Sequence, residues 1–353
     1  MDVTQLQAQF SDTLTKTSLS IGLILGVKMK IFDTILALDS PSTSSEIANK
    51  CSLKERYVRE WLGLMSTSGI ISVDGTSESD KFYASDALET ALKESGRTLG
   101  ILENLLALLP HLPELEKCFQ LDGPRGIPHE RFTEIYRLFD LNSSRKFTST
   151  FLQEFIGHVP DVISRLSQGG DVLEIGCNSG FSTVALAKMF KKSKFYGQDI
   201  CKEGILSAKL LSRDMENVNF SIQDACKRTG FDEESFDWIL AMDVIHDLPY
   251  PDAAIKELYR ILKKDGILSI VDINAHSRPS QNLNNPRATF LYAISLCHCT
   301  PMSFGLPDSM GLGATWGKER AKDLFEECGF RLESVQDMES DKLQSHYVFK
   351  KLL

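Results

Sequence analysis

A glycine-rich turn follows a short apolar run in the segment VLEIGCNSGFS, residues 172–182. The run ends in Glu174, and turn-forming residues then follow at Gly176, Asn178 and Gly180. A strand that leads into such a turn and opens a helix presents backbone N–H groups to the phosphate or sugar of a nucleotide. The segment therefore predicts a binding site for a ligand that contains a nucleotide or nucleoside.

The turn differs from two common nucleotide motifs. Dinucleotide-binding folds need a small third residue for close helix–strand packing, and Phe181 stands at that position. A phosphate-binding P-loop needs a Gly-Lys-Ser/Thr sequence, which does not follow this turn. The pattern that remains is E-x-G-x-N-x-G after a strand. Asn178 suits it because asparagine adopts left-handed backbone angles more readily than most residues.

Acidic residues end the next two predicted strands. Asp199 closes YGQDI, 19 residues after Gly180, and a carboxylate there can accept hydrogen bonds from both ribose hydroxyls. Asp224 closes the following strand in SIQDA, and LYRILKKDGILSIVDI (258–273) reads as helix, turn and strand. These motifs come in a fixed order over roughly one parallel-sheet domain.

Together they resemble class I S-adenosylmethionine-dependent methyltransferases, whose first motif is usually written E/D-x-G-x-G-x-G; Asn178 replaces its middle glycine. The resemblance implies S-adenosylmethionine as cofactor, with Asp224 at the adenine amino group. Asp243 faces either cofactor or substrate. The expected cofactor-binding residues are Glu174, Gly176, Asn178, Gly180, Asp199, Ile200, Asp224, Ala225 and Asp243.

The segment DVIHDLPYPD, 243–252, follows the fourth predicted strand, where substrates approach in such folds. Its His246-Asp247 pair resembles that of plant-type and hydroxyindole-type O-methyltransferases, in which the histidine is the general base. A hydroxyl acceptor must lose a proton, and an imidazole with a pKa of about 6.5 suits that role. Asp247 orients a neighbour or caps the next helix. The alternative is that His246 bonds the backbone and only shapes the site.

The amino-terminal region, about 1–95, reads as amphipathic helices, a helix-turn-helix capped by Ser44 or Ser45, and a two-stranded hairpin. This is a winged-helix pattern, and it resembles the dimerisation domain of small-molecule O-methyltransferases. The resemblance implies a homodimer. GLGATWGKERA, 311–321, and the IHD motif also occur in a group of bacterial and animal methyltransferases with this domain order.

The predicted fold class is α/β: an N-terminal helical winged-helix domain plus a Rossmann-like, doubly wound, seven-stranded methyltransferase domain. The boundaries expected are 1–95 for the winged helix, 96–160 for a helical linker and 161–353 for the alternating strands and helices, which predict a mostly parallel sheet. Its last two strands are expected to form an antiparallel pair at the edge.

Residues 274–314 are rich in aromatic and polarizable side chains, and a segment here covers the substrate in related enzymes. Tyr292, His298 and Trp316 are therefore candidates for lining the substrate pocket. An apolar cover of this kind excludes water and favours a flat or apolar acceptor. The alternative is that these side chains belong to the apolar core.

Composition limits the remaining classes. The 353 residues are 42% hydrophobic and 25% charged, as in soluble globular proteins, and the net charge of −9 argues against a nucleic-acid partner. No apolar run approaches the roughly 20 residues of a membrane span. No basic signal-peptide start is present, so we expect a cytoplasmic protein. The eight cysteines read as free thiols, and C-H-C at 297–299 lacks a second ligand pair, so no metal site is predicted.

Four functions fit these features. The first is methyl transfer to a small molecule, foremost at oxygen with His246 as base, and the second is the same transfer at nitrogen or carbon. The third is a DNA-binding regulator that senses S-adenosylmethionine; its recognition helix would carry Lys54, Arg56 and Arg59 but also Glu55 and Glu60. The fourth is a binding protein without catalysis, suggested by Asn178 alone.

Overall fold

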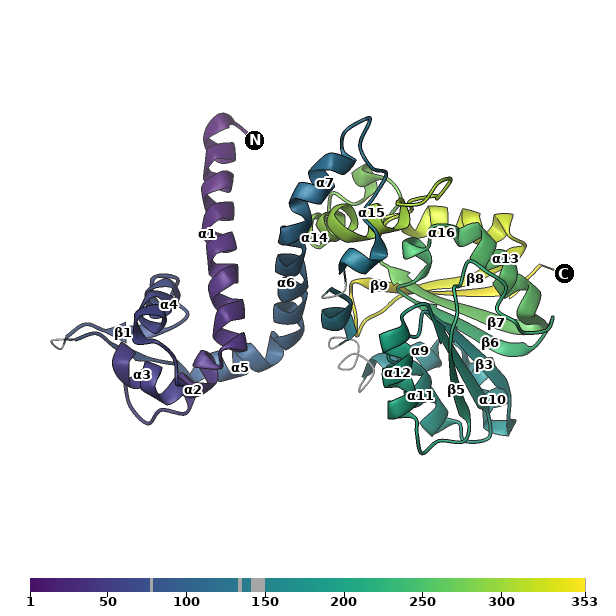
Figure 1. Cartoon of the computed structure of the whole chain (residues 1–353), viewed down its shortest axis with the longest axis horizontal. Helices are drawn as coiled ribbons and strands as arrows, with labels where there is room; N and C mark the ends of the chain where they lie inside the picture. The colour runs from purple at the N-terminus through teal and green to yellow at the C-terminus, as the bar shows by residue number, and fades with distance from the viewer. Residues whose placement is uncertain (77–78, 133–134, 141–149, 353) are drawn as a thin grey trace. The chain divides into compact units, whose positions relative to one another are not determined.

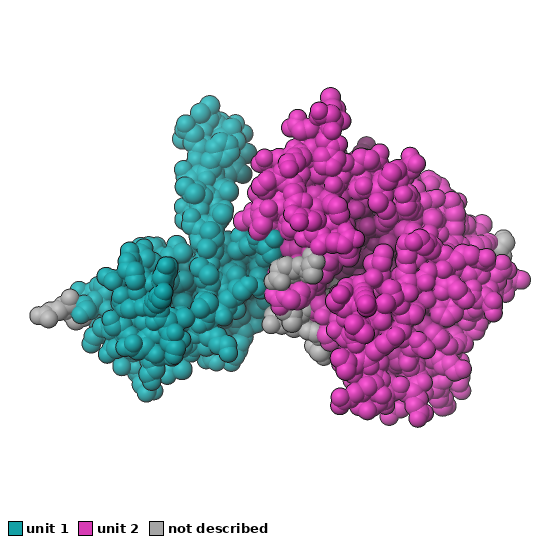
Figure 2. All heavy atoms as spheres, in the orientation of Figure 1, with its two compact units in different colours: residues 1–107 teal, residues 108–353 magenta. Residues whose placement is uncertain are grey.

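A computed structural model describes residues 1–76, 79–132, 135–140 and 150–352 of the chain. The chain divides into two compact units, residues 1–107 and residues 108–353, which Figure 2 colours separately. The three domain ranges expected from the sequence stay a prediction. Residues 133–134 and 141–149 of the expected helical linker lie outside the described part of the chain.

The first unit has the predicted winged-helix order of elements (Figure 1). Its elements are α1 (Val3–Lys28), α2 (Ile31–Leu36), α3 (Ser44–Cys51), α4 (Glu55–Thr67), β1 (Ser72–Asp74), β2 (Lys81–Tyr83), α5 (Asp86–Glu94) and most of α6 (Gly96–Leu108). The strands β1 and β2 pair antiparallel as the wing. The helix cap predicted at Ser44 or Ser45 is wrong by one or two positions. Thr43 caps α3, because its side chain accepts from the Glu46 N–H while Glu46 bonds back to the Thr43 N–H.

Apolar side chains on one face of each short helix form the core of this unit. Ile47 of α3, Val58 and Leu62 of α4 and Phe82 of β2 are all buried in it. The Trp61 indole reaches α1 and donates to a backbone carbonyl there. The helix-turn-helix therefore packs as a module on the carboxyl-terminal half of α1, since the first half of that helix is exposed.

The second unit is the α/β part of the chain. Its helices are η1 (Leu109–His111), α7 (Leu112–Cys118), η2 (His129–Phe132), α9 (Thr150–Gly157), α10 (Pro160–Gln168), α11 (Phe181–Met189), α12 (Lys202–Leu211), η3 (Ile245–Asp247), α13 (Pro251–Ile261), η4 (Pro279–Gln281), α14 (Ala288–Ile294), the π-helix η5 (Ser295–Cys299), α15 (Thr300–Ser303) and α16 (Gly317–Glu327). Its strands are β3 (Asp171–Ile175), β4 (Lys194–Asp199), β5 (Val218–Ile222), β6 (Phe236–Met242), β7 (Leu262–Ile273), β8 (Phe330–Asp337) and β9 (Gln344–Lys351).

These strands form one seven-stranded sheet in the order β5-β4-β3-β6-β7-β9-β8. The first five are parallel, and β9 runs antiparallel to both β7 and β8. The predicted seven-stranded fold and its antiparallel edge pair are therefore confirmed. Because the chain moves from β3 outward through β4 and then resumes on the other side at β6, the order reverses between β3 and β6. Ligands of open α/β sheets bind in the crevice at such a switch point.

Apolar residues cover both faces of this sheet, as expected of strands buried on both sides. Leu173 and Ile175 of β3 belong to a core that includes α13 and α16. Val172, the residue before Leu173, points to the opposite face and belongs to a second core that includes α9, α10 and α11. The sheet is therefore wound with helices on both sides (Figure 1). Polar residues lie at its carboxyl-terminal edge, where the parallel strands end.

Two further features concern the whole described chain. None of its described helices combines the length and the apolar character needed to cross a membrane. The eight cysteines, all of which fall in described positions, are free thiols.

Candidate active site

The turn after β3 is built from residues that tolerate unusual backbone angles. Gly176 has a φ of 66° and Asn178 a φ of 43°, both in the left-handed region. A side chain at Gly176 would place its first carbon 2.2 Å from a methyl carbon of Val244, at the end of β6. The close approach of these two strand ends therefore requires glycine at this position.

Asp199, at the end of β4, joins the next strand to that turn. One carboxylate oxygen accepts from the Asn178 N–H at 2.8 Å and the other from the Cys201 N–H at 2.7 Å. Burial raises the pKa of Asp199, and those backbone donors oppose the rise. Each oxygen keeps a second lone pair, so the carboxylate can still accept hydrogen bonds from a ligand. Ile200, which follows it, is exposed beside this edge.

Asp224 and Ala225 follow β5, the next strand outward. One Asp224 oxygen accepts from the Cys226 N–H at 2.9 Å, which closes a turn, and the other lies 3.2 Å from the ammonium of Lys227. Ala225 packs against the apolar core. The turn residues, Asp199 and Asp224 thus follow three adjacent strands, in the order the sequence predicts for a nucleoside site.

Glu174 lies elsewhere than the other acidic residues of this set. Its side chain is buried and accepts hydrogen bonds from the hydroxyls of Ser182 and Thr183 on α11. Burial raises its pKa to about 7, which those hydroxyls partly oppose. Glu174 therefore fastens β3 to α11, and its contact with a cofactor stays a prediction.

His246 lies on η3, directly after β6, and is 4% exposed. Its Nδ1 is 2.7 Å from a carboxylate oxygen of Asp272, near the end of β7, which is fully buried. Burial alone would lower the pKa of His246. The neighbouring carboxylates of Asp272 and Asp247 outweigh it and raise the pKa well above its usual value. The Asp272 contact fixes the ring and leaves Nε2 facing the site.

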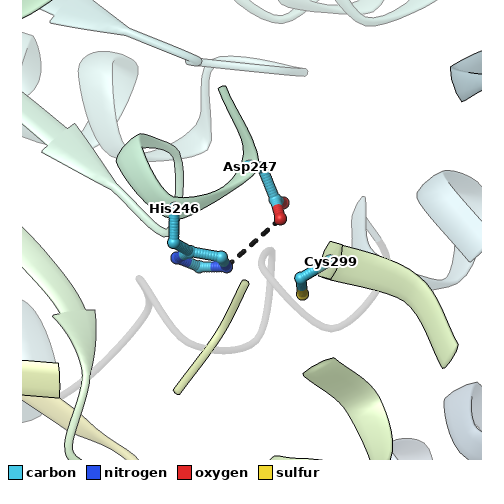
Figure 3. A group of neighbouring side chains, drawn as sticks. All are labelled: His246, Asp247 and Cys299. Atoms are coloured by element: carbon cyan, nitrogen blue, oxygen red, sulfur yellow. Dashed lines mark ion pairs between the residues drawn. The ribbon is translucent and has the colours of Figure 1, made fainter. Parts of the chain in front are cut away.

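Asp247 and Cys299 lie on the Nε2 side of this ring, as Figure 3 shows. The nearer carboxylate oxygen of Asp247 is 3.4 Å from Nε2. Burial raises the pKa of Asp247 to about 6, against the opposing effect of His246. Burial also raises the pKa of the Cys299 thiol to about 12, and the charge of Asp247 adds to the rise. No motif or spacing in the sequence points to Cys299 or Asp272 at this site.

Asp243 has left-handed backbone angles, with a φ of 56°, where β6 ends. Its N–H donates to the Val271 carbonyl, and its carboxylate accepts from the side chain of Gln344 on β9. Asp243 is therefore held against β7 and β9, which lie on the side of β6 away from β3. Whether it faces cofactor or substrate stays a prediction.

The three residues expected to line a pocket lie in different surroundings. His298, on the π-helix, is buried under the rings of Phe132 and Phe139, and burial lowers its pKa to about 3. The Tyr292 hydroxyl accepts from the side chain of Asn282. Trp316 is a buried member of the apolar core. Of the three, only His298 adjoins a residue that lies beside His246, because it directly precedes Cys299 in the chain. A pocket-lining role for all three stays a prediction.

Residues between 108 and 140 also contribute to this region, although no spacing in the sequence marks them. Tyr136 stacks on His129 with ring centres 4.3 Å apart. Burial raises the pKa of Tyr136, and the charges of Asp247 and Asp199 add to it. Asp140 accepts a hydrogen bond of 2.8 Å from the Ser179 hydroxyl in the glycine-rich turn. This part of the chain therefore covers the edge of the sheet.

Two family models match the chain. A methyltransferase domain model matches residues 166–329, and an Rv2258c-like winged helix-turn-helix model matches residues 17–88. A curated relative, the fatty-acid O-methyltransferase of Mycolicibacterium smegmatis, is 25% identical over 154 residues, which are 44% of this chain and 50% of that protein. The chain spans about half the length of the first curated relatives that it matches.

Solved structures share the fold over nearly the whole chain. Human N-acetylserotonin methyltransferase, in complex with S-adenosylmethionine, aligns with a TM-score of 0.68 at 16% identity and covers 99% of both chains. A mitomycin 7-O-methyltransferase aligns with a TM-score of 0.70 at 15% identity, over 99% of this chain and 98% of that one. At such identities the likeness concerns the fold. With the family models, it confirms both predicted domain types: the chain joins an N-terminal winged helix-turn-helix domain to a methyltransferase domain.

Proposed function

We propose that this protein transfers a methyl group from S-adenosylmethionine to a hydroxyl group of a small molecule, with His246 as the general base. The observation that carries the proposal is the His246–Asp272 contact of 2.7 Å at the carboxyl edge of the sheet. It places an oriented imidazole beside the switch point at which such folds bind their ligands.

The cofactor fits the residues of this edge. Gly176 and Asn178 adopt the left-handed backbone angles that the tight turn requires, and Asp199 retains lone pairs for the two ribose hydroxyls. Asp224 lies one strand further out, on the side expected for the adenine amino group. S-adenosylmethionine supplies an electrophilic methyl group on a positively charged sulfur.

The residues of the protein must carry out the other parts of the reaction. The protein must align a lone pair of the acceptor with the S–CH3 bond, and it must exclude water while doing so. His246 Nε2 would take the proton that the hydroxyl loses, after the ring has released its own proton, because the nearby carboxylates raise its pKa. Asp272 holds the ring and stabilises the charged imidazolium that results, as a positioning residue. Tyr136 and His298 would cover the acceptor from the opposite side, which favours a flat or apolar molecule.

A homodimer formed through the first unit belongs to the same proposal. The exposed part of α1 carries large apolar side chains three, four or seven residues apart, so they fall on one face of the helix. These side chains are Val3, Leu6, Phe10, Leu14, Ile21 and Leu25. An exposed apolar stripe of this length is typical of an interface, and a second copy of α1 matches it in length and in chemistry.

The experiment that tests the proposal is a transfer assay with methyl-labelled S-adenosylmethionine. The purified full chain would be incubated with a panel of phenols, hydroxyindoles, fatty acids and aromatic amines, and products would be separated by chromatography. The proposal predicts label on an oxygen acceptor. Label on an amine alone would favour the nitrogen alternative, and binding of the cofactor without any product would favour a protein without catalysis.

A further inference from the structure

Three different metal-binding atoms meet beside the base. They are Nε2 of His246, a carboxylate oxygen of Asp247 and Sγ of Cys299, and they all lie within 4.8 Å of one another. Figure 3 shows the three side chains turned toward one space, two from η3 and one from the π-helix. His246 and Cys299 are buried, and Asp247 is largely so. We propose that these three side chains form a binding site for Zn²⁺.

The donor set determines the choice of metal. Zinc is bound by imidazole nitrogen, thiolate sulfur and carboxylate oxygen, whereas Mg²⁺ and Ca²⁺ take oxygen ligands. Bonds of about 2.0–2.3 Å to a tetrahedral ion put neighbouring donors roughly 3.3–3.7 Å apart. His246 Nε2 and the Asp247 oxygen, at 3.4 Å, already have that separation. The Cys299 sulfur lies within 4.8 Å of both atoms.

The surroundings of His246 also suit a metal ligand. The other ring nitrogen of His246 is 2.7 Å from the buried carboxylate of Asp272. Zinc-bound histidines almost always donate their second N–H in this way, which orients the ring and raises the basicity of the ligating nitrogen. In addition, the Asp247 oxygen of the cluster is buried, and its ion-pair partner is His246 Nε2 at 3.4 Å. A metal ion between them would take the place of the Nε2 proton.

Local backbone structure explains why the sequence did not reveal this site. Cys299 is brought to His246 by a π-helix, Ser295–Cys299. Helices of this kind are rare, and those that occur are often found at functional sites. The sequence predicted no metal site, because C-H-C at 297–299 lacks a second ligand pair; of its two cysteines, Cys299 belongs to the cluster and Cys297 does not. Three protein ligands leave a fourth position open.

Metal binding and proton acceptance by His246 exclude each other, because both need the lone pair on Nε2. The Zn²⁺ site therefore goes beyond the proposed methyl transfer and would oppose it. Metal affinity can be measured without cofactor or acceptor. Cofactor affinity can be measured without metal, so either proposal can fail alone.

The test uses the full chain, freed of metal with a chelator and titrated with ZnCl2 in a calorimeter. We expect one Zn²⁺ per chain in the wild type. Cys299→Ser should weaken binding at least tenfold, and Asp272→Asn by about 10–100-fold through loss of ring orientation. The matched control is Cys297→Ser, which removes a thiol two residues away and should bind Zn²⁺ as the wild type does.

The metal titrations test the Zn²⁺ site separately from the proposed function. No Zn²⁺ binding by the wild type, or equal affinity of the wild type and Cys299→Ser, would overturn the site. If Cys299→Ser melts at a lower temperature than the wild type, Asp247→Asn replaces it as the ligand variant, with the same expected loss. A parallel titration with S-adenosylmethionine in the absence of metal reports on the proposed function alone.

Discussion

Charged side chains are arranged in opposite ways in the two units. On α4 of the winged helix, Arg56 pairs with Glu60, and the two side chains are 63% and 70% exposed. At the carboxyl edge of the sheet, His246 and Asp272 pair at 4% and 0% exposure. The first pair lies along the helix surface, one turn apart. The second joins two strand ends and is enclosed by the protein.

The difference indicates where the chemistry lies. Exposed pairs of this kind contribute about 0–1 kcal/mol and are screened by salt. A buried pair is costly to desolvate, and buried groups with shifted pKa values cluster at functional sites. The acidic and basic residues of α4 also balance each other, unlike the basic surface that DNA requires. We therefore place the function at the sheet edge, and each prediction below tests that choice.

The largest effect is expected at His246. Replacing it with alanine removes the base, so transfer to a hydroxyl acceptor should fall by about 10²–10⁴-fold in kcat. Rates would be measured with labelled cofactor at saturating acceptor. Asp272→Asn keeps the His246 imidazole but removes the carboxylate that orients it. This variant should lower kcat with little change in KM. A rate unchanged in His246→Ala would remove the base from the account.

Asp199 should give the next largest effect. Asp199→Ala removes a charge-assisted contact to the ribose, which we expect to weaken S-adenosylmethionine binding by about 2–3 kcal/mol. Calorimetry measures this directly, and thermal melting checks that the turn remains folded. Asp214→Ala removes an exposed carboxylate and serves as the control. Equal affinities of the two variants would refute the ribose contact.

Phe10 tests whether the first unit forms the homodimer interface. The exposed ring lies on the apolar stripe of α1, and burying a phenylalanine contributes about 1.5–3 kcal/mol. Phe10→Asp should therefore weaken the homodimer, observed as a lower mass in light scattering at micromolar concentration. Gln9→Asp adds the same charge beside the stripe and should remain dimeric. A wild type that is monomeric under these conditions would exclude this interface.

Acid should destabilise the second unit through His346. This residue of β9 is buried, and burial lowers its pKa to about 3. Its folded pKa lies below the unfolded value of about 6.5, so stability is complete above that value and is lost as the pH falls below it. Between pH 7 and pH 5 the loss should be about 2 kcal/mol. Urea unfolding of His346→Phe should show a smaller loss than the wild type; parallel losses would mean that another group titrates.

The smallest effect is expected from DNA. Since Arg56 and Arg59 are each paired with a glutamate on the same helix, few cations of α4 are available for phosphates. A mixed-sequence duplex should run unretarded with the full chain at low salt. Retardation that disappears in Arg56→Ala would indicate that the winged helix binds DNA. The function would then lie in the first unit and not at the sheet edge.

The sequence predicted the strands and the order of the sheet-edge residues because these follow local rules. Gly176, Asp199 and Asp224 each follow a strand, and parallel strands align their carboxyl ends. It did not predict the partners that come from distant segments. Asp272 lies in a strand whose pairing with β6 brings it to His246, and Cys299 depends on a π-helix that has no local signal. Glu174 belongs to a motif, yet its orientation is determined by two hydroxyls on α11.

Calorimetric titration of the full chain with S-adenosylmethionine, with NAD as the matched comparison, tests the central claim most directly. The account predicts micromolar binding of S-adenosylmethionine at one site per chain and no heat with NAD. Binding of NAD, or no binding of either compound, would contradict an S-adenosylmethionine site at the carboxyl edge of β3 and β4.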